Sequence, residues 1–195
     1  MTTTVFAPSI ATTRGGDVDN RAVYITFGLA YILGHGAASL SKGDNPLVSL
    51  PGWLPMTLLG TGFAIGTVFA TMAALRAQRD AGKPEVRTGQ LLGLSWVVGF
   101  AALFLAITGI SSTLATPGLQ TLLWPAGSGL VVGLIYLAEG AARRNILHYS
   151  VGSWLALVST VALFFSPPAF FAILAIAGGG GYVIATILEF RRHRR

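Results

Sequence analysis

A seven-residue stretch of small and apolar residues, Gly60–Gly66 (GTGFAIG), recurs later in the chain as Gly127–Gly133 (GSGLVVG). A weaker third copy begins at Gly178–Gly180. The apolar segments ahead of the first two copies also agree, because Gly28–Tyr31 (GLAY) matches Gly93–Trp96 (GLSW). Several positions that recur together indicate one structural unit copied within the chain. We interpret the unit as a pair of apolar helices, a transmembrane hairpin.

The composition is that of a membrane protein. Of 195 residues, 53% are hydrophobic and 10% are charged, whereas about a quarter of a soluble domain is charged. A span needs roughly 20 apolar residues to cross a hydrocarbon core of ~30 Å. Six segments meet this requirement, at about 22–40, 53–75, 89–111, 118–141, 147–165 and 169–190. We therefore predict an all-α integral membrane domain over residues 21–195, preceded by a disordered cytoplasmic tail at 1–20.

The repeat predicts how the six helices are arranged. The hairpins lie at about 22–75, 89–141 and 147–190, and all three point the same way, so we expect a pseudo-threefold axis along the membrane normal. Small residues allow close helix contact in lipid, and the even-numbered helices carry most of them. We expect these three helices to meet near the centre, with glycines that serve helix packing or line a pore: Gly60, Gly62, Gly66, Gly127, Gly129, Gly133, Gly178 and Gly180.

Basic residues indicate the orientation. They gather in the segment 76–88, at Arg143 and Arg144, and at the C-terminus, whereas the alternate loops at 112–117 and 166–168 carry no charge. The positive-inside rule then places both termini in the cytoplasm and the protein in the cell membrane, the inner membrane of a bacterium. A cleavable signal peptide at 21–40, with Ala37–Ser39 near the cleavage point, is the competing interpretation. It is disfavoured, since cleavage would remove half of the first hairpin.

Several function classes are excluded or disfavoured. The net charge of +6 lies beside apolar runs, as membrane orientation requires, and does not indicate nucleic-acid binding. The chain has no cysteine, no P-loop, and no HExxH or GxSxG motif. We therefore predict no enzyme activity, no cofactor and no metal.

Two ionisable residues within the spans are candidates for polar control of a pore. His35 lies about 21 Å along the first helix from Arg21, at 1.5 Å per residue. It either relays or senses protons, or is an interfacial side chain bonded to a carbonyl or water, which we favour. Glu139 precedes Arg143 by four residues, so the two can bridge on one helix face. We expect it to tether the helix end.

Other polar and aromatic residues are assigned structural roles. Glu189 stands before Arg192 as Glu139 does before Arg143, and we expect a second tether there. His148 begins the fifth helix and is expected in the headgroup zone. Trp96 and Trp154 share a repeat position, so they either line a common cavity or pack in the helix bundle, and packing is preferred.

The second and third repeats resemble a known family. Trp96–Phe104, Pro117, Gly127–Gly129, Ile135–Tyr136 and Arg143–Arg144 are similar to the repeat of the HdeD-like small membrane proteins. That family has six helices, and its named member is linked to acid resistance, so the resemblance implies a stress-related membrane protein without catalysis. The longer charged segment 76–88 and the Thr-rich tail depart from the family pattern.

A transport function is the preferred interpretation. Six helices in a chain of this length also resemble the membrane subunits of modular importers, the acetate-transporter group and small amide channels. We predict a small-solute transport or permease component, with a non-transporting stress-response or structural protein as the alternative. The expected partners are the lipid bilayer, a separate ATPase or other membrane subunit, and further copies of the chain.

Overall fold

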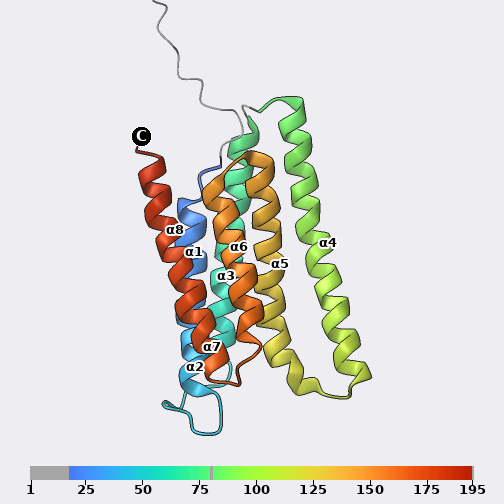
Figure 1. Ribbon diagram of the computed structural model, residues 1–195, viewed down its shortest axis with the longest axis vertical. Helices are drawn as coiled ribbons and strands as arrows, with labels where there is room; N and C mark the ends of the chain where they lie inside the picture. The colour runs from blue at the N-terminus through green and yellow to red at the C-terminus, as the bar shows by residue number, and fades with distance from the viewer. Residues whose placement is uncertain (1–17, 80, 195) are drawn as a thin grey trace, which may run out of the picture.

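The computed structural model describes residues 18–79 and 81–194, and the regular secondary structure in them is helical (Figure 1). The first long helix joins α1 (Arg21–Ala30), the π-helical segment η1 (Tyr31–His35) and α2 (Gly36–Ser41). Next come α3 (Leu54–Arg79), α4 (Lys83–Thr113), the short η2 (Pro117–Leu119), α5 (Gln120–Arg143) and α6 (Ile146–Ala162). The last long helix joins α7 (Ala169–Ile173), the π-helical segment η3 (Leu174–Gly178) and α8 (Gly179–Arg192).

The helices are those of a multi-pass membrane protein. Five of the long helices have the length and apolar composition to cross a bilayer, and α6, with 17 residues, is a shorter apolar helix. The predicted spans agree with the observed helices to within a few residues at most ends. The segment 76–88 differs, because α3 continues to Arg79 and α4 begins at Lys83. Its basic residues therefore lie on helix ends rather than in a long loop.

Some of the long helices pack against their neighbours in the chain, and others pack against helices that are distant in the sequence. The α1 segment packs against α3 and α8, α6 packs against α5 and the α7–α8 segment, and α4 packs against α5. Contact between α3 and α4 is sparse, and Figure 1 shows α4 standing beside α5 at the edge of the bundle. Burial follows this arrangement. Half of the residues in the most apolar stretch of the first helix are buried in the bundle, whereas only 6% of those in the most apolar stretch of α4 are buried.

The predicted meeting of the even-numbered helices is wrong. Among the described residues, α3, α5 and α8 share no extensive contact with one another, and each packs mainly against other helices. The glycines explain the difference. A Cβ added at Gly62 would overlap Ala30 of α1, and one at Gly66 would meet the Phe27 ring at 2.5 Å. Small residues permit close approach without selecting the partner. The pseudo-threefold relation of the hairpins stays a prediction.

The closest helix pair is α5 and α6. A Cβ at Gly133 would lie 2.5 Å from the Ala156 nitrogen and 2.7 Å from the Gly152 oxygen, so only glycine fits there. A Cβ at Gly140 would overlap the backbone of Tyr149 in the same way. The two backbones therefore touch along most of their shared length, which maximises the van der Waals contact that holds helices together in lipid.

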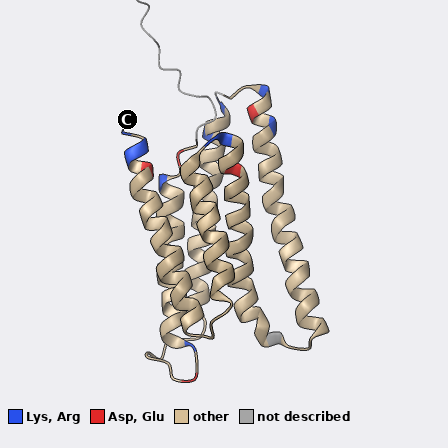
Figure 2. Ribbon diagram, viewed as in Figure 1, with Lys and Arg blue, Asp and Glu red and all other residues tan. Residues whose placement is uncertain are grey.

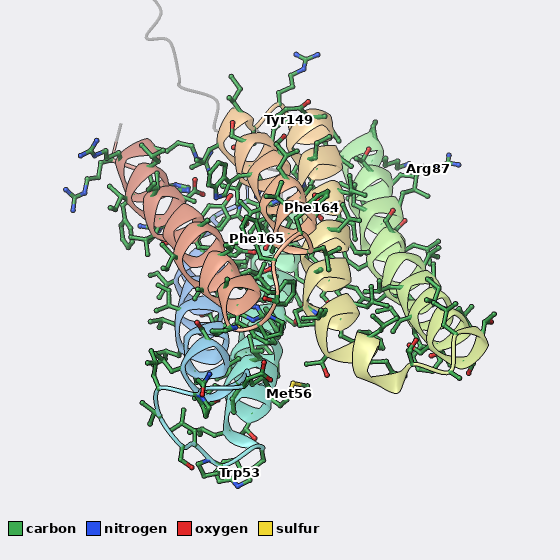
Figure 3. All side chains as sticks on the ribbon, turned by 60° about the horizontal axis from the view of Figure 1, so that its bottom comes forward. Trp53, Met56, Arg87, Tyr149, Phe164 and Phe165 are labelled. Atoms are coloured by element: carbon green, nitrogen blue, oxygen red, sulfur yellow. The ribbon has the colours of Figure 1, made fainter. Side chains whose placement is uncertain are left out.

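The charges divide between the two ends of the bundle. Figure 2 shows Lys and Arg at the end formed by the C-termini of α3, α5 and α8 and the N-termini of α1, α4 and α6. We call this the basic end and the opposite one the distal end. Among the described cations only Lys42, in the loop after α2, lies at the distal end. Figure 3 shows Trp53 at the distal end of α3, and Phe164 and Phe165 in the connection after α6.

Residues 18–20, which we assigned to the tail, pack against α8. The Asn20 backbone N–H donates to Glu189 Oε1 at 3.1 Å, and the Arg192 guanidinium donates to the Val18 carbonyl at 3.1 Å. The remainder of the predicted disordered tail, residues 1–17, lies outside the described residues.

Substitution of Gly133 tests the α5–α6 contact. We expect Gly133→Ala to lower the free energy of unfolding by about 1–3 kcal/mol, because the added methyl group forces the two backbones apart. The measurement is the midpoint of unfolding in mixed detergent micelles. Gly60→Ala is the matched control, since a Cβ there meets nothing within 4 Å. Equal midpoints for the two variants would contradict the assignment.

Candidate functional site

The inward face of the first helix carries aromatic side chains with polar atoms. Tyr24, Phe27, Tyr31 and His35 are buried and recur at the spacing of one helix face. The Tyr31 ring centroid lies 4.9 Å from that of His35 and 5.5 Å from that of Tyr182 on α8. Polar aromatic groups thus extend along the core from the distal end towards the basic end.

At the basic end, four side chains from four helices form one hydrogen-bonded network. Trp96 Nε1 on α4 donates to Glu139 Oε1 on α5 at 3.3 Å. Glu139 Oε2 lies 3.1 Å from His148 Nε2 on α6, and His148 Nδ1 lies 2.7 Å from the Tyr24 hydroxyl on α1. The ring of Tyr136 covers the imidazole at a centroid distance of 4.1 Å. We call Trp96, Glu139, His148 and Tyr24 the basic-end network.

The acceptor capacity of the carboxylate sets the direction of these bonds. An ionised carboxylate only accepts, so Nε2 of His148 carries a hydrogen and donates to Glu139. In a neutral imidazole the other nitrogen then accepts. The Tyr24 hydroxyl therefore donates to Nδ1, and both ring nitrogens of His148 have a partner.

A tight turn brings Glu139 and His148 together. Arg144 adopts the left-handed conformation at φ 54° and ends α5. The Asn145 side chain then caps α6 by accepting from the His148 backbone N–H at 3.0 Å. Because α6 runs back along α5, His148 in its first turn faces Glu139 near the end of α5. The network thus depends on the same close packing as Gly133 and Gly140.

His35 occupies the other end of the core. It lies in η1, which contacts η3 of the last helix, and its ring stacks on Phe171 of α7 at a centroid distance of 6.2 Å. The side chain is 2% exposed, and its Nδ1 has no hydrogen-bond partner among the described residues. The preferred expectation of an interfacial histidine bonded to a carbonyl or water stays a prediction. Segments of π-helix occur often at functional sites.

Three adjoining cavities lie in the space between α3 and α5. The distal cavity, of about 600 Å³, is lined by His35, Lys42 and Gln120 together with hydroxyl-bearing and apolar residues. The central cavity and the basic-end cavity each have a volume of about 410 Å³. The distal and central cavities share Phe63 and Ser128 as wall residues. The central and basic-end cavities share Phe27, Thr67 and Trp96.

The predicted site residues fall into two groups. His35 and Glu139, the candidates for polar control, line the first and last of these cavities and so lie at opposite ends of the bundle. Most of the predicted glycines lie against neighbouring helices. A Cβ at Gly127 would meet Leu103 on α4, one at Gly129 would overlap Ser159 on α6, and one at Gly178 would meet the Tyr31 ring. Gly60 lines the distal cavity, and a Cβ at Gly180 would meet nothing within 4 Å.

Sequence reasoning missed two members of the basic-end network. His148, expected in the headgroup zone, is 4% exposed and bonded on both ring nitrogens. Tyr24, to which the sequence analysis assigned no role in a site, is fully buried. The helical spacing of Tyr24, Tyr31 and His35 was an available signal for Tyr24. For His148 the available signal was its position in the first turn of α6. The connection from α5 to α6 is short, so this turn lies opposite Glu139 near the end of α5.

The two tryptophans at the shared repeat position have different environments. Trp96 lines two of the cavities and donates to Glu139. Trp154 is 47% exposed and donates to the Ala177 carbonyl in η3 at 2.8 Å. Among the cavities described above, none is lined by both residues.

A second polar cluster joins the chain ends at the basic end. Glu189 is fully buried and accepts from Asn20 and, at 2.8 Å on each carboxylate oxygen, from Arg192, as a tether would. Asp19 accepts from the Arg21 guanidinium at 2.6 Å, and these hydrogen bonds hold the pKa of Asp19 below its usual value. Asp19, Glu189 and His193 are close enough to hold a cation. Arg192 already compensates the central carboxylate, so an ion-pair cluster describes this arrangement better.

Comparisons of the chain with protein-family models, with curated proteins and with solved structures find no match. The helices and their composition define a multi-pass membrane protein. The resemblance to the HdeD-like proteins stays a prediction.

Removal of the Glu139 side chain tests the basic-end network. We expect Glu139→Ala to lower the free energy of unfolding by about 1–3 kcal/mol, because His148 Nε2 and Trp96 Nε1 lose their acceptor in a buried site. The readout is the unfolding midpoint in mixed micelles. Glu85→Ala, which removes an exposed carboxylate on α4, should change stability by about 0.5 kcal/mol or less. A similar small change in both variants would show that the network does not hold the helices.

Proposed function

We propose that this protein is a component of a small-solute transport system in the cell membrane. The observation that supports the proposal is the series of three cavities between α3 and α5, which share wall residues and reach from His35 to Glu139. A path through a membrane protein needs such a space along the helix axes, with few polar groups at chosen depths.

The walls favour a small solute of low charge. The central cavity is lined by Phe27, Tyr31, Phe63, Phe100 and other mainly apolar residues, and Thr67 and Ser128 contribute hydroxyl groups. A charged solute would lose its hydration there without a compensating partner, which is unfavourable by several kcal/mol. Among these three cavities, acidic, basic and histidine side chains line only the two at the ends.

The non-transporting alternative gains less support. A protein whose helices serve structure alone is expected to fill the space between them, because the packing contacts are what hold it together in lipid. Here α3 and α5 leave that space open.

We propose that the basic end faces the cytoplasm, by the positive-inside rule. We also propose that the exposed apolar face of α4 serves contacts with lipid, a second membrane subunit or another copy of the chain.

Flux through liposomes tests the proposal. We expect purified protein to raise the permeability of liposomes to at least one of glycerol, urea, acetate and methylammonium, with or without a pH gradient, as followed by light scattering after mixing. Ser128→Phe fills the junction of the distal and central cavities and should reduce that flux about tenfold, a change of ~1.4 kcal/mol in the barrier.

The control places the same substitution on a lipid-facing surface. Ser95→Phe adds the same ring on the exposed face of α4 and should leave the flux unchanged. If none of the four solutes crosses faster than in protein-free liposomes, the transport proposal fails.

A further inference from the structure

We propose that the basic-end and central cavities together bind one anionic phospholipid, with its phosphate beside Arg143 and one acyl chain in the central cavity. The inference goes beyond the proposed transport of a small solute, because a lipid binds there whether or not a solute crosses the bundle. If both proposals hold, the acyl chain and the solute compete for the central cavity.

The two cavities open sideways between α3 and α4. Contact between these two helices is sparse, although they follow one another in the chain. The wall residues on either side of the opening are exposed: Thr67 and Thr71 on α3, and Gly93 and Val97 on α4. These residues lie within the two candidate spans. An opening at their depth therefore faces the hydrocarbon of the bilayer, and a lipid chain can enter through it.

The polar end of the site presents donors that suit a phosphate. Arg143, near the end of α5, lines the basic-end cavity together with the amide side chains of Gln78 and Gln90. A Cβ added at Gly89 would lie 2.9 Å from Gln78 Nε2 and 3.6 Å from Arg143 Nη2. The amide of α3 and the guanidinium of α5 thus converge on the surface of α4. A guanidinium can bind two phosphate oxygens through parallel N–H bonds.

The charge around the opening favours an anion. The last turn of α3 carries Arg76 and Arg79, and the first turns of α4 carry Lys83 and Arg87 (Figure 2). The segment 76–88 contains two acidic residues against these four cations. Basic pockets between transmembrane helices are typical sites for the head groups of anionic lipids. The four cations raise the local concentration of such lipids beside the opening, and Arg143 lies within the cavity wall.

The carboxylate of Glu139 does not take the place of the phosphate. Glu139 precedes Arg143 by four residues and so lies about 6 Å deeper along α5. Its Oε1 accepts from Trp96, and its Oε2 lies 3.1 Å from His148 Nε2. Both oxygens are therefore directed at the basic-end network. A guanidinium has five N–H donors, so Arg143 can bind a phosphate in addition to its contacts within the protein.

The central cavity lies at the depth that an acyl chain reaches. Val132, in its wall, precedes Arg143 by eleven residues, which is about 16 Å along α5 at 1.5 Å per residue. One leaflet contributes roughly 15 Å of a hydrocarbon core of ~30 Å. A chain whose phosphate lies beside Arg143 therefore ends near Val132, among the rings of Phe27, Phe63 and Phe100.

The head group must supply the selectivity of such a site. An acyl chain is solvated by other lipids as well as by apolar side chains, so it gains little by moving from the bilayer into the cavity. A groove that is merely filled by the surrounding lipid would accept phospholipids of any head group. A preference for an anionic head group that depends on Arg143 therefore separates a binding site from such a groove.

Native mass spectrometry of the full chain measures this preference. The protein is purified in a neutral detergent, freed of lipid, and titrated with phosphatidylglycerol or with phosphatidylcholine of the same acyl chains. We expect one phosphatidylglycerol to bind at least about fivefold more tightly than phosphatidylcholine, since one nearby Arg contributes about that factor. Equal affinities, or no bound lipid, would overturn the proposal even if solute flux is observed. Selective binding would support it even if no solute crosses.

Loss of the guanidinium tests the position of the phosphate. Arg143→Gln should weaken the binding of phosphatidylglycerol about fivefold and leave that of phosphatidylcholine unchanged. Arg191→Gln is the matched control, because it removes an exposed cation at the end of α8 that does not line the cavity. It should change the binding of phosphatidylglycerol by less than about twofold. Equal losses in the two variants would contradict the assigned site.

A pair of neighbouring substitutions tests the position of the chain. Val97 lines the central cavity with 66% of its surface exposed, whereas Val98, with 58% exposed, lines none of the three cavities. Val97→Trp should weaken the binding of phosphatidylglycerol by at least about threefold, because the indole ring takes the space of the chain. Val98→Trp should leave it unchanged, and equal effects of the two would contradict the proposal. This pair and the wild-type comparison decide the matter if Arg143→Gln does not fold.

Discussion

The contact between the backbones of α5 and α6 is the constraint on which the rest of the bundle depends. Apolar side chains gain nothing by leaving lipid for a helix interface, so close packing and hydrogen bonds must hold the helices together. Gly133, Gly140 and Gly152 supply that packing along the length of α6. The same approach sets the distance between Glu139 and His148, because both lie near the turn that joins the two helices. Packing and polar chemistry are therefore coupled at the basic end.

The first helix has the complementary role of filling the core. Its inward face presents aromatic rings to α3 and α8, and its polar atoms meet partners only where another helix brings them, as His148 does for Tyr24. A buried tyrosine hydroxyl without a partner is unfavourable in an apolar environment. The requirement to satisfy that hydroxyl links the position of α1 to the turn between α5 and α6, although the two segments are far apart in the chain.

The helices could be predicted from the sequence because bilayer thickness imposes one length on every span. The same reasoning could not predict which helix each glycine faces. Gly62 and Gly129 have equivalent places in the repeat, yet one meets α1 and the other meets α6. The basic-end network could not be predicted from the sequence either. Glu139 is recognisable as an acidic residue within a span, but its bond to His148 depends on the left-handed conformation of Arg144, which no general preference of arginine would indicate.

The open space between α3 and α5 follows from these pairings. The surface of α3 that could have met α5 instead packs on α1 at Gly62 and Gly66, and α5 uses its glycines on α6. Each even-numbered helix thus makes its closest contact with an odd-numbered helix and not with another even-numbered one. What remains between α3 and α5 is bordered by larger side chains such as Phe63, Trp96 and Phe100, which cannot interlock as closely as glycines do. The cavities are therefore a geometric consequence of where the small residues lie. Their two ends differ chemically, because His35 lines the distal cavity and Glu139 lines the basic-end cavity.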